Sequence, residues 1–166
     1  MGIPSKTMIV GIGSFFRSDD AAGLIVIRKL RGRLPQYVSA LEHEGSGASL
    51  LETWQGAVRV TLIDAVSSGA EPGHVFRIDL RRARFPKERF RRSTHALNLP
   101  DTLALARALG RLPRQLLCYG IEGKNFEVGI GLSRPVEEGT SQVADLILSE
   151  FRAPSWTGPT QGGGRA

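Results

Sequence analysis

Two aspartates and one histidine are the residues of this sequence whose types could do chemistry together. Asp20 follows the first apolar run, Asp64 comes at the end of the third, and His95 precedes a predicted helix. Two carboxylates and an imidazole offer oxygen and nitrogen ligands to a borderline divalent ion such as zinc or nickel. With three protein ligands the ion keeps open positions, where it can polarise a carbonyl group or lower the pKa of bound water.

Each of these three residues also has a structural interpretation. They are scattered along the chain and form no local motif. Asp20 and its neighbour Asp19 both suit the first turn of a helix, where negative charge is favourable. Asp64 lies near buried surface, where an unpaired charge is costly, so a backbone amide or an arginine could pair with it. His95 could be a loop histidine whose hydrogen bonds are satisfied.

The elements that must position these residues follow from the apolar pattern. A continuous apolar run predicts a strand over residues 6–13 that is buried on both faces. A helix is predicted to begin with Ser18 as its N-cap and to end at Pro35. Further strands are expected at 37–42, 58–65, 74–80 and 115–121, the third of them at an edge, and further helices at 48–55, 98–112 and 135–151.

This order of elements predicts the fold class. Strands alternating with helices indicate a three-layer α/β domain, with a twisted, mostly parallel sheet flanked by helices on both faces. Ligands of such sheets bind outside the carboxyl ends of the strands, where Asp20, Asp64 and His95 are expected. We predict inward-facing side chains at Leu99, Leu103, Ala106, Leu109, Val143, Leu146, Ile147 and Phe151.

Length and composition describe an ordinary globular chain. Its 166 residues predict a single domain over 1–152, followed by a Gly-, Pro- and Thr-rich tail over 153–166 without ordered structure. Cys118 is the only cysteine, so an intrachain disulfide and a Cys-rich zinc site are excluded, and we expect it in the core. The sequence shows no signal peptide and no membrane-spanning run, so we expect a cytoplasmic protein without a membrane partner.

The basic excess is local. The formal net charge is +6, and residues 81–92 carry a dense group of arginines interleaved with Phe85 and Phe90. One hypothesis is therefore a nucleic-acid-binding module that uses this segment, with the two phenylalanines stacking on bases. A local excess of this kind is more typical of a solvated segment or a protein-docking surface, so nucleic acid is not the expected partner.

A nucleotide cofactor is not expected either. Gly11 and Gly13 suggest a phosphate-binding turn, but the dinucleotide fingerprint requires a third glycine or alanine where Phe16 stands. Asp19 and Asp20 would repel pyrophosphate from the helix N-terminus. The sequence also lacks a Walker lysine and a Gly-x-Ser-x-Gly motif.

Four segments resemble motifs of the nickel–iron hydrogenase maturation proteases. They are Gly-Ile-Gly-Ser-Phe-Phe-Arg-Ser-Asp-Asp-Ala-Ala-Gly at 11–23, Leu-Ile-Asp-Ala at 62–65, the loop 69–73 and Ser-Thr-His-Ala-Leu at 93–97. They occur in family order, and the resemblance runs from about Met8 to Phe151. It implies an α/β endopeptidase that removes a C-terminal peptide from the hydrogenase large-subunit precursor after nickel has been inserted.

The resemblance also implies roles for the three residues. Asp20, Asp64 and His95 correspond to the catalytic, nickel-contacting site of the family, and the nickel is thought to belong to the precursor. Peptide hydrolysis could use water activated by the ion or by a carboxylate. A relative that binds nickel-loaded partners without cleaving them is a further alternative.

The chain departs from the family pattern at three places. Ser14 stands where the family usually has Asn, and Asp20 where many members have Glu. The family's Asp-Gly-Gly-Thr segment appears here as Glu-His-Glu-Gly-Ser at 42–46. Because the resemblance links that segment to substrate choice, Glu42, His43 and Glu44 are candidates for substrate recognition, with a solvated loop as the alternative.

Overall fold

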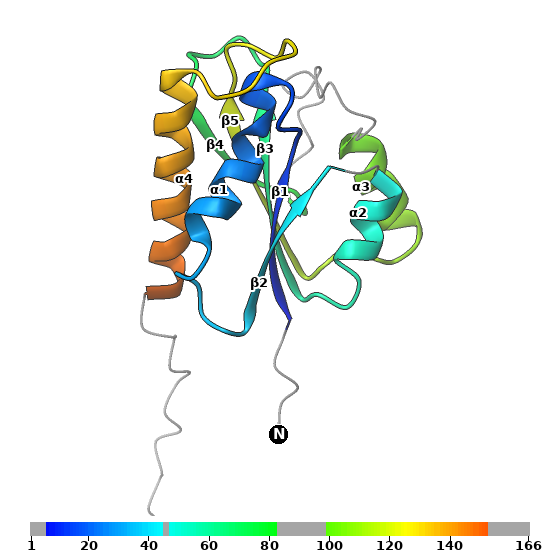
Figure 1. Ribbon diagram of the computed structural model, residues 1–166. Coiled ribbons are helices and arrows are strands. Elements are labelled where there is room, and N and C mark those ends of the chain that lie inside the picture. The colour runs from blue at the N-terminus through cyan, green and yellow to red at the C-terminus, as the bar shows by residue number, and fades with distance from the viewer. Residues whose placement is uncertain (1–5, 45–46, 83–98, 153–166) are drawn as a thin grey trace, which may run out of the picture.

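A twisted five-stranded sheet forms the centre of the fold (Figure 1). The computed structural model describes residues 6–44, 47–82 and 99–152. The strands are β1 (Thr7–Ile12), β2 (Val38–His43), β3 (Arg59–Val66), β4 (Val75–Asp79) and β5 (Gln115–Glu122), in the order β2-β1-β3-β5-β4. All pairings are parallel except that of β4, which lies antiparallel to β5 at an edge. The predicted mostly parallel sheet and its edge strand are confirmed.

Helices cover both faces of the sheet. They are α1 (Ala22–Leu30), α2 (Gly47–Thr53), α3 (Leu99–Ala108) and α4 (Arg134–Arg152), with a short 3-10 helix, η1 (Ser18–Ala21), before α1. α1 and α4 pack on one face, and α2 and α3 on the other (Figure 1). Each face therefore has its own apolar core, which confirms the predicted three layers.

Some sequence-based expectations are wrong in detail. Leu109 follows the end of α3 and is 52% exposed, and Leu146 of α4 is 39% exposed, so neither faces inward. The buried stripe of α4 runs through Val143, Ala144, Ile147 and Leu148, and Leu146 falls outside it. Cys118 is buried as predicted. The predicted tail, 153–166, lies outside the described residues, and the single-domain boundary at 152 stays a prediction.

The parallel register gathers the carboxyl ends of β1, β2, β3 and β5 at one edge, the upper edge in Figure 1. We call it the carboxyl edge. Ile12 pairs with His43, and Val66 pairs with Glu122, so these strands end side by side. Among the described helices, none combines the length and apolar character needed to cross a bilayer.

Candidate active site

Asp64 is a buried carboxylic acid near the end of β3. It pairs with Gly120 of β5 and is only 4% exposed. Because side chains alternate along a strand, it lies on the same face as Leu62, which is the face that α2 and α3 cover. Burial is the main cause that raises the pKa of Asp64 well above its ordinary value, and the charge of Asp20 raises it further. A backbone hydrogen bond at Ala65 lowers it only in part, and no arginine is ion-paired with Asp64 among the described residues.

Asp20 reaches this place because glycines let the backbone pack closely. It lies in η1 and is 2% exposed. A Cβ atom at Gly13, where φ is +149°, would lie 1.9 Å from the carbonyl oxygen of Asp20. A Cβ atom at Gly23 would lie 2.4 Å from the carbonyl oxygen of Ile63 in β3. Gly13, one of the two glycines that suggested a phosphate-binding turn, thus has a different role: together with Gly23 it lets η1 and α1 pack closely on β1 and β3.

The structure therefore brings Asp20 and Asp64 together. Two buried carboxylates within electrostatic reach of each other disfavour double ionisation. A shared proton relieves the repulsion, and so does a cation bound between them. The chemistry open to this pair is that of a cation site or of an acid with a raised pKa.

The third predicted ligand, His95, lies outside the described residues, as does the basic segment beyond Arg82. In the parts of the chain that the structure describes, no three His, Cys, Asp or Glu side chains form a group that could hold a metal ion. The two aspartates are thus the described part of the predicted site. The Cys118 thiol is no substitute nucleophile, because burial and then the charge of Asp64 raise its pKa and keep it protonated.

Asp19, next to Asp20, holds the loop that borders the site. Its carboxylate accepts hydrogen bonds from the backbone amides of Lys124 (2.8 Å), Asn125 (2.9 Å) and Ser133 (2.7 Å), and from Ser133 Oγ (2.9 Å). The sequence offered Asp19 only as a helix-dipole residue. The adjacent pair of acids was the available signal, but its partners lie more than a hundred residues away.

Removing this carboxylate should loosen the loop. We expect Asp19→Ala to lower the free energy of unfolding by about 3 kcal/mol, because three backbone amides lose a buried, charged acceptor. Urea denaturation of this variant measures the loss. Asp145→Ala, which removes an exposed carboxylate from α4, is the control and should change stability by less than about 0.5 kcal/mol. Equal stability of the two variants would contradict the role given to Asp19.

Glu122 does the same for the neighbouring loop. At the end of β5, its carboxylate accepts hydrogen bonds from the amides of Ser68 and Gly69 and from Ser68 Oγ. The side chain is buried, and its partners follow β3 directly. Two buried acids, Asp19 and Glu122, therefore fix the loops around the aspartate pair, and sequence reasoning identified neither role.

Comparison with known proteins decides the family. The sequence model described as hydrogenase maturation protease, HycI, matches residues 26–150. The chain belongs to the hydrogenase maturation protease family. It is therefore a peptidase, which confirms the resemblance and the enzyme class predicted from the sequence.

The relatives match most of this chain. The chain is 28% identical to the hydrogenase 2 maturation protease of Escherichia coli K12 over 151 residues, which cover 89% of this chain and 91% of that protein. It is 32% identical to the HoxM hydrogenase expression/formation protein of Azotobacter vinelandii over 150 residues, covering 86% and 72%. The solved structure of the hydrogenase maturating endopeptidase HybD from E. coli matches with a TM-score of 0.73 at 26% identity, covering 89% and 92%.

The segment proposed for substrate recognition begins at the end of β2. The Glu42 carboxylate accepts hydrogen bonds from Arg28 and Arg31, so it ties β2 to α1 and its neighbouring turn. The His43 ring lies 3.3 Å from Ser49 Oγ, and the His43 carbonyl accepts a hydrogen bond from Gly13. Glu44 is exposed. The structure gives Glu42 a structural contact, and a recognition role for these residues stays a prediction.

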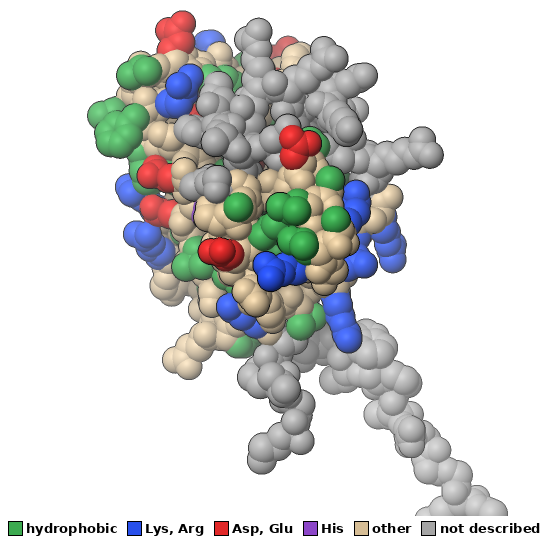
Figure 2. Space-filling view, turned by 90° about the vertical axis from the view of Figure 1, so that its right-hand side faces the viewer, with side chains coloured by type: hydrophobic (Ala, Val, Ile, Leu, Met, Phe, Trp, Pro, Cys, Tyr) green, Lys and Arg blue, Asp and Glu red, His purple; other side chains and the backbone are tan. Residues whose placement is uncertain are grey.

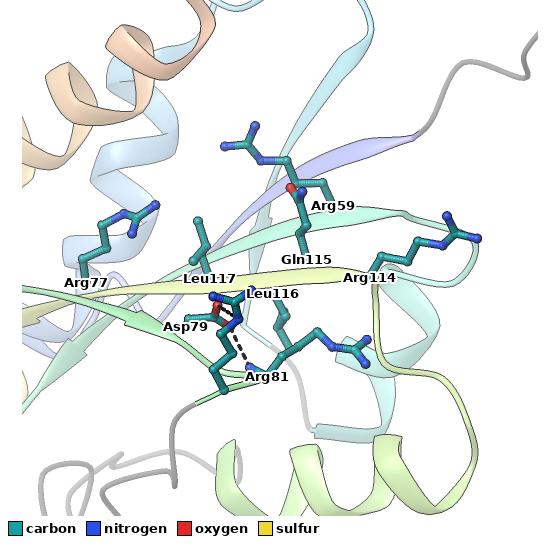
Figure 3. Close-up of a pocket in the computed structure, with 9 residues that line it drawn as sticks. Arg59, Arg77, Asp79, Arg81, Arg114, Gln115, Leu116 and Leu117 are labelled. Carbon is teal, nitrogen blue, oxygen red and sulfur yellow. Dashed lines mark hydrogen bonds and ion pairs between the residues drawn. The ribbon is translucent and has the colours of Figure 1, made fainter. Parts of the chain in front are cut away.

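An arginine-lined pocket of about 640 Å³ lies at the opposite end of the sheet (Figure 3). Its residues begin β3 and β5 or end β4, so it opens at the amino ends of the parallel strands, away from Asp20 and Asp64. Arg59 is ion-paired with Glu150, and Arg81 donates to the Pro113 carbonyl. The arginine side chains point in different directions (Figure 3), so they do not converge on one ligand position. Neither Asp20 nor Asp64 lines this pocket.

Proposed function

We propose that the protease removes the C-terminal peptide from a nickel-loaded [NiFe]-hydrogenase large-subunit precursor. In this proposal Asp20, Asp64 and His95 contact nickel that the precursor supplies. The observation that carries it is the aspartate pair at the carboxyl edge, in which the charge of Asp20 adds to burial in raising the pKa of Asp64. A divalent ion that enters with the substrate neutralises this repulsion and so strengthens binding of the loaded precursor.

The position of α3 supports grouping His95 with the two aspartates. α3 begins only four residues after His95, and those four residues span at most about 14 Å. Thr102 of α3 adjoins Gly47, the first residue of α2, because a Cβ atom at Gly47 would lie 2.1 Å from its hydroxyl. Since α2 follows the carboxyl end of β2, α3 starts near the carboxyl edge, on the face where Asp64 lies. An imidazole at this point gives nickel the nitrogen ligand that suits it.

In the proposed complex, both the precursor and the enzyme supply ligands to the nickel ion. Ligands of the precursor already hold the ion, and the enzyme adds two carboxylates and one imidazole, which place the scissile peptide beside the nickel. Hydrolysis also requires a proton to leave the attacking water, and a carboxylate of the pair lies beside the nickel where it can accept that proton. The buried surroundings of the pair exclude bulk water and strengthen its electrostatic effect.

The test is a cleavage assay with a nickel-loaded and a nickel-free form of the same precursor. We expect loss of the C-terminal peptide from the loaded form only, because the metal completes the contact with the enzyme. Asp20→Asn and His95→Ala should each slow cleavage by about tenfold to a hundredfold. Mass spectrometry of the precursor reports the cut.

Equal cleavage of both precursor forms would contradict nickel recognition, and full activity of both variants would show that these are the wrong residues. Binding of the loaded precursor without any cleavage would instead support the non-cleaving relative considered from the sequence. Asp145→Asn, at an exposed position of α4, is a control that makes the same charge change away from Asp20 and Asp64.

A further inference from the structure

Two segments that are far apart in the sequence form one fixed rim beside the candidate site. Residues 16–18 and 127–129 are joined by hydrogen bonds from Ser18 N to the Gly129 carbonyl and from Gly129 N to the Phe16 carbonyl, both 2.9 Å. Ser18 Oγ also donates to the Glu127 carbonyl at 2.9 Å. The Asp19 carboxylate anchors the same loop further along. The rim is therefore held by backbone and side-chain contacts on both sides.

This rim presents the most exposed large apolar side chains of the described residues. Phe16 is 67% exposed, Val128 84% and Ile130 87%. Arg17 and Gly129 form a parallel bridge, and side chains alternate along bridged segments. Phe16, Val128 and Ile130 are each one residue from this bridge, so the hydrogen bonds between the two segments hold them close together. We call these three residues the apolar rim.

A fixed group of exposed apolar side chains indicates an interaction surface, because such groups on a free protein lose the stabilisation that burial would give. The apolar rim lies at the carboxyl edge, because Phe16 follows β1 and residues 128–130 follow β5, and Asp20 comes four residues after Phe16. A surface pocket of about 380 Å³ adjoins it, lined by residues that include Arg17, Lys124 and Phe126.

We propose that the apolar rim docks an apolar segment of the hydrogenase precursor next to the scissile bond. This inference rests on the proposed function, since a chain whose nickel meets Asp20 must pass the edge that carries the rim. We choose the precursor as the occupant because the apolar rim is continuous with the site. Hydrogen bonds join its two segments to each other and to Ser18 of η1. The rim supplies affinity and orientation, and the aspartate pair supplies the chemistry.

The double substitution Val128→Gln and Ile130→Gln tests the proposal. Both side chains are exposed, so the variant should fold with an unchanged melting temperature. We expect KM for the nickel-loaded precursor to rise about tenfold while kcat changes less than twofold, because the lost contacts act in binding and not in hydrolysis. The control is Leu105→Gln with Leu109→Gln, two exposed leucines in α3 and just after it. α3 is on the side of the molecule that faces the viewer in Figure 2. This control should leave KM unchanged.

The outcomes separate this proposal from the proposed function. An unchanged KM in the rim variant, with Asp64→Asn inactive, would overturn the rim and leave the site intact. If no precursor is cleaved even by the parent protein, fluorescence anisotropy with the labelled precursor still decides. Weaker binding of the rim variant than of the leucine control supports docking at the rim, and equal binding of the two overturns it.

Discussion

Replacing Asp64 with asparagine is expected to abolish precursor cleavage while making the fold more stable. Asparagine has nearly the same size but cannot carry the negative charge that the proposed nickel contact and proton transfer require. We expect a fall in the cleavage rate on the order of a hundredfold or more. The free energy of unfolding should rise by about 1 kcal/mol, a gain typical of relieving an unfavourable active-site group.

The gain in stability should depend on pH, with a definite sign. The pKa of Asp64 is raised in the folded protein above its ordinary value of 3.8, so the unfolded chain loses this proton more easily. The wild-type chain therefore loses stability as the pH rises from about 3.8 through the raised pKa. Asp64→Asn does not show this loss of stability, because asparagine has no carboxyl group to ionise. The difference between variant and wild type should be small near pH 3 and should grow as the pH rises toward neutrality.

Urea denaturation at several pH values, together with the cleavage assay, measures both effects. Asp145→Asn removes an exposed carboxylate from α4 and is the matched control, with neither activity nor stability changed. Wild-type cleavage by Asp64→Asn would remove this residue from the mechanism. A stability loss at neutral pH would show that the buried carboxylate is satisfied in the fold, against the like-charge arrangement described above.

The layers of the fold and its mostly parallel sheet could be predicted from the apolar pattern and the order of the elements, whereas the strand order comes from the structure. A run such as 58–65, apolar at nearly every position, can only be satisfied in a sheet covered on both faces, and β3 is the buried central strand. Once alternating helices are present, parallel pairing and right-handed crossovers leave few arrangements. The same logic predicts that Asp20 and Asp64 lie at one edge of the sheet, because each follows or ends a parallel strand.

Local chemistry around η1 could not be predicted, because its partners come from distant segments. The prediction that Ser18 caps a helix is wrong. Its φ of +52° is in the left-handed region, and its hydroxyl donates to the Glu127 carbonyl instead of accepting from the first helical turn. A lone Ser-Asp-Asp pattern favours the local cap, but tertiary hydrogen bonds to the loop 123–133 outweigh it. The contact between His95 and the two aspartates stays a prediction.

Replacing Gly23 with alanine is expected to have the second large effect. Gly23 is in α1, so helix propensity alone predicts a gain of up to about 1 kcal/mol. The structure predicts the opposite. A Cβ atom would lie 2.4 Å from the Ile63 carbonyl oxygen and 2.5 Å from that of Ile12, and both atoms belong to the backbone of central strands. Because neither strand can move without disturbing the sheet, we expect a loss of about 3 kcal/mol.

The same substitution should also reduce cleavage, because α1 and η1 must shift outward and carry Asp20 away from Asp64. Thermal and urea unfolding measure the first effect, and the precursor assay measures the second. Gly32→Ala is the control: its φ of +72° costs about 1 kcal/mol in alanine, but nothing lies within 4 Å of the added Cβ, and activity should persist. If Gly23→Ala loses no more stability than Gly32→Ala, close packing of α1 on β3 does not position the aspartate pair.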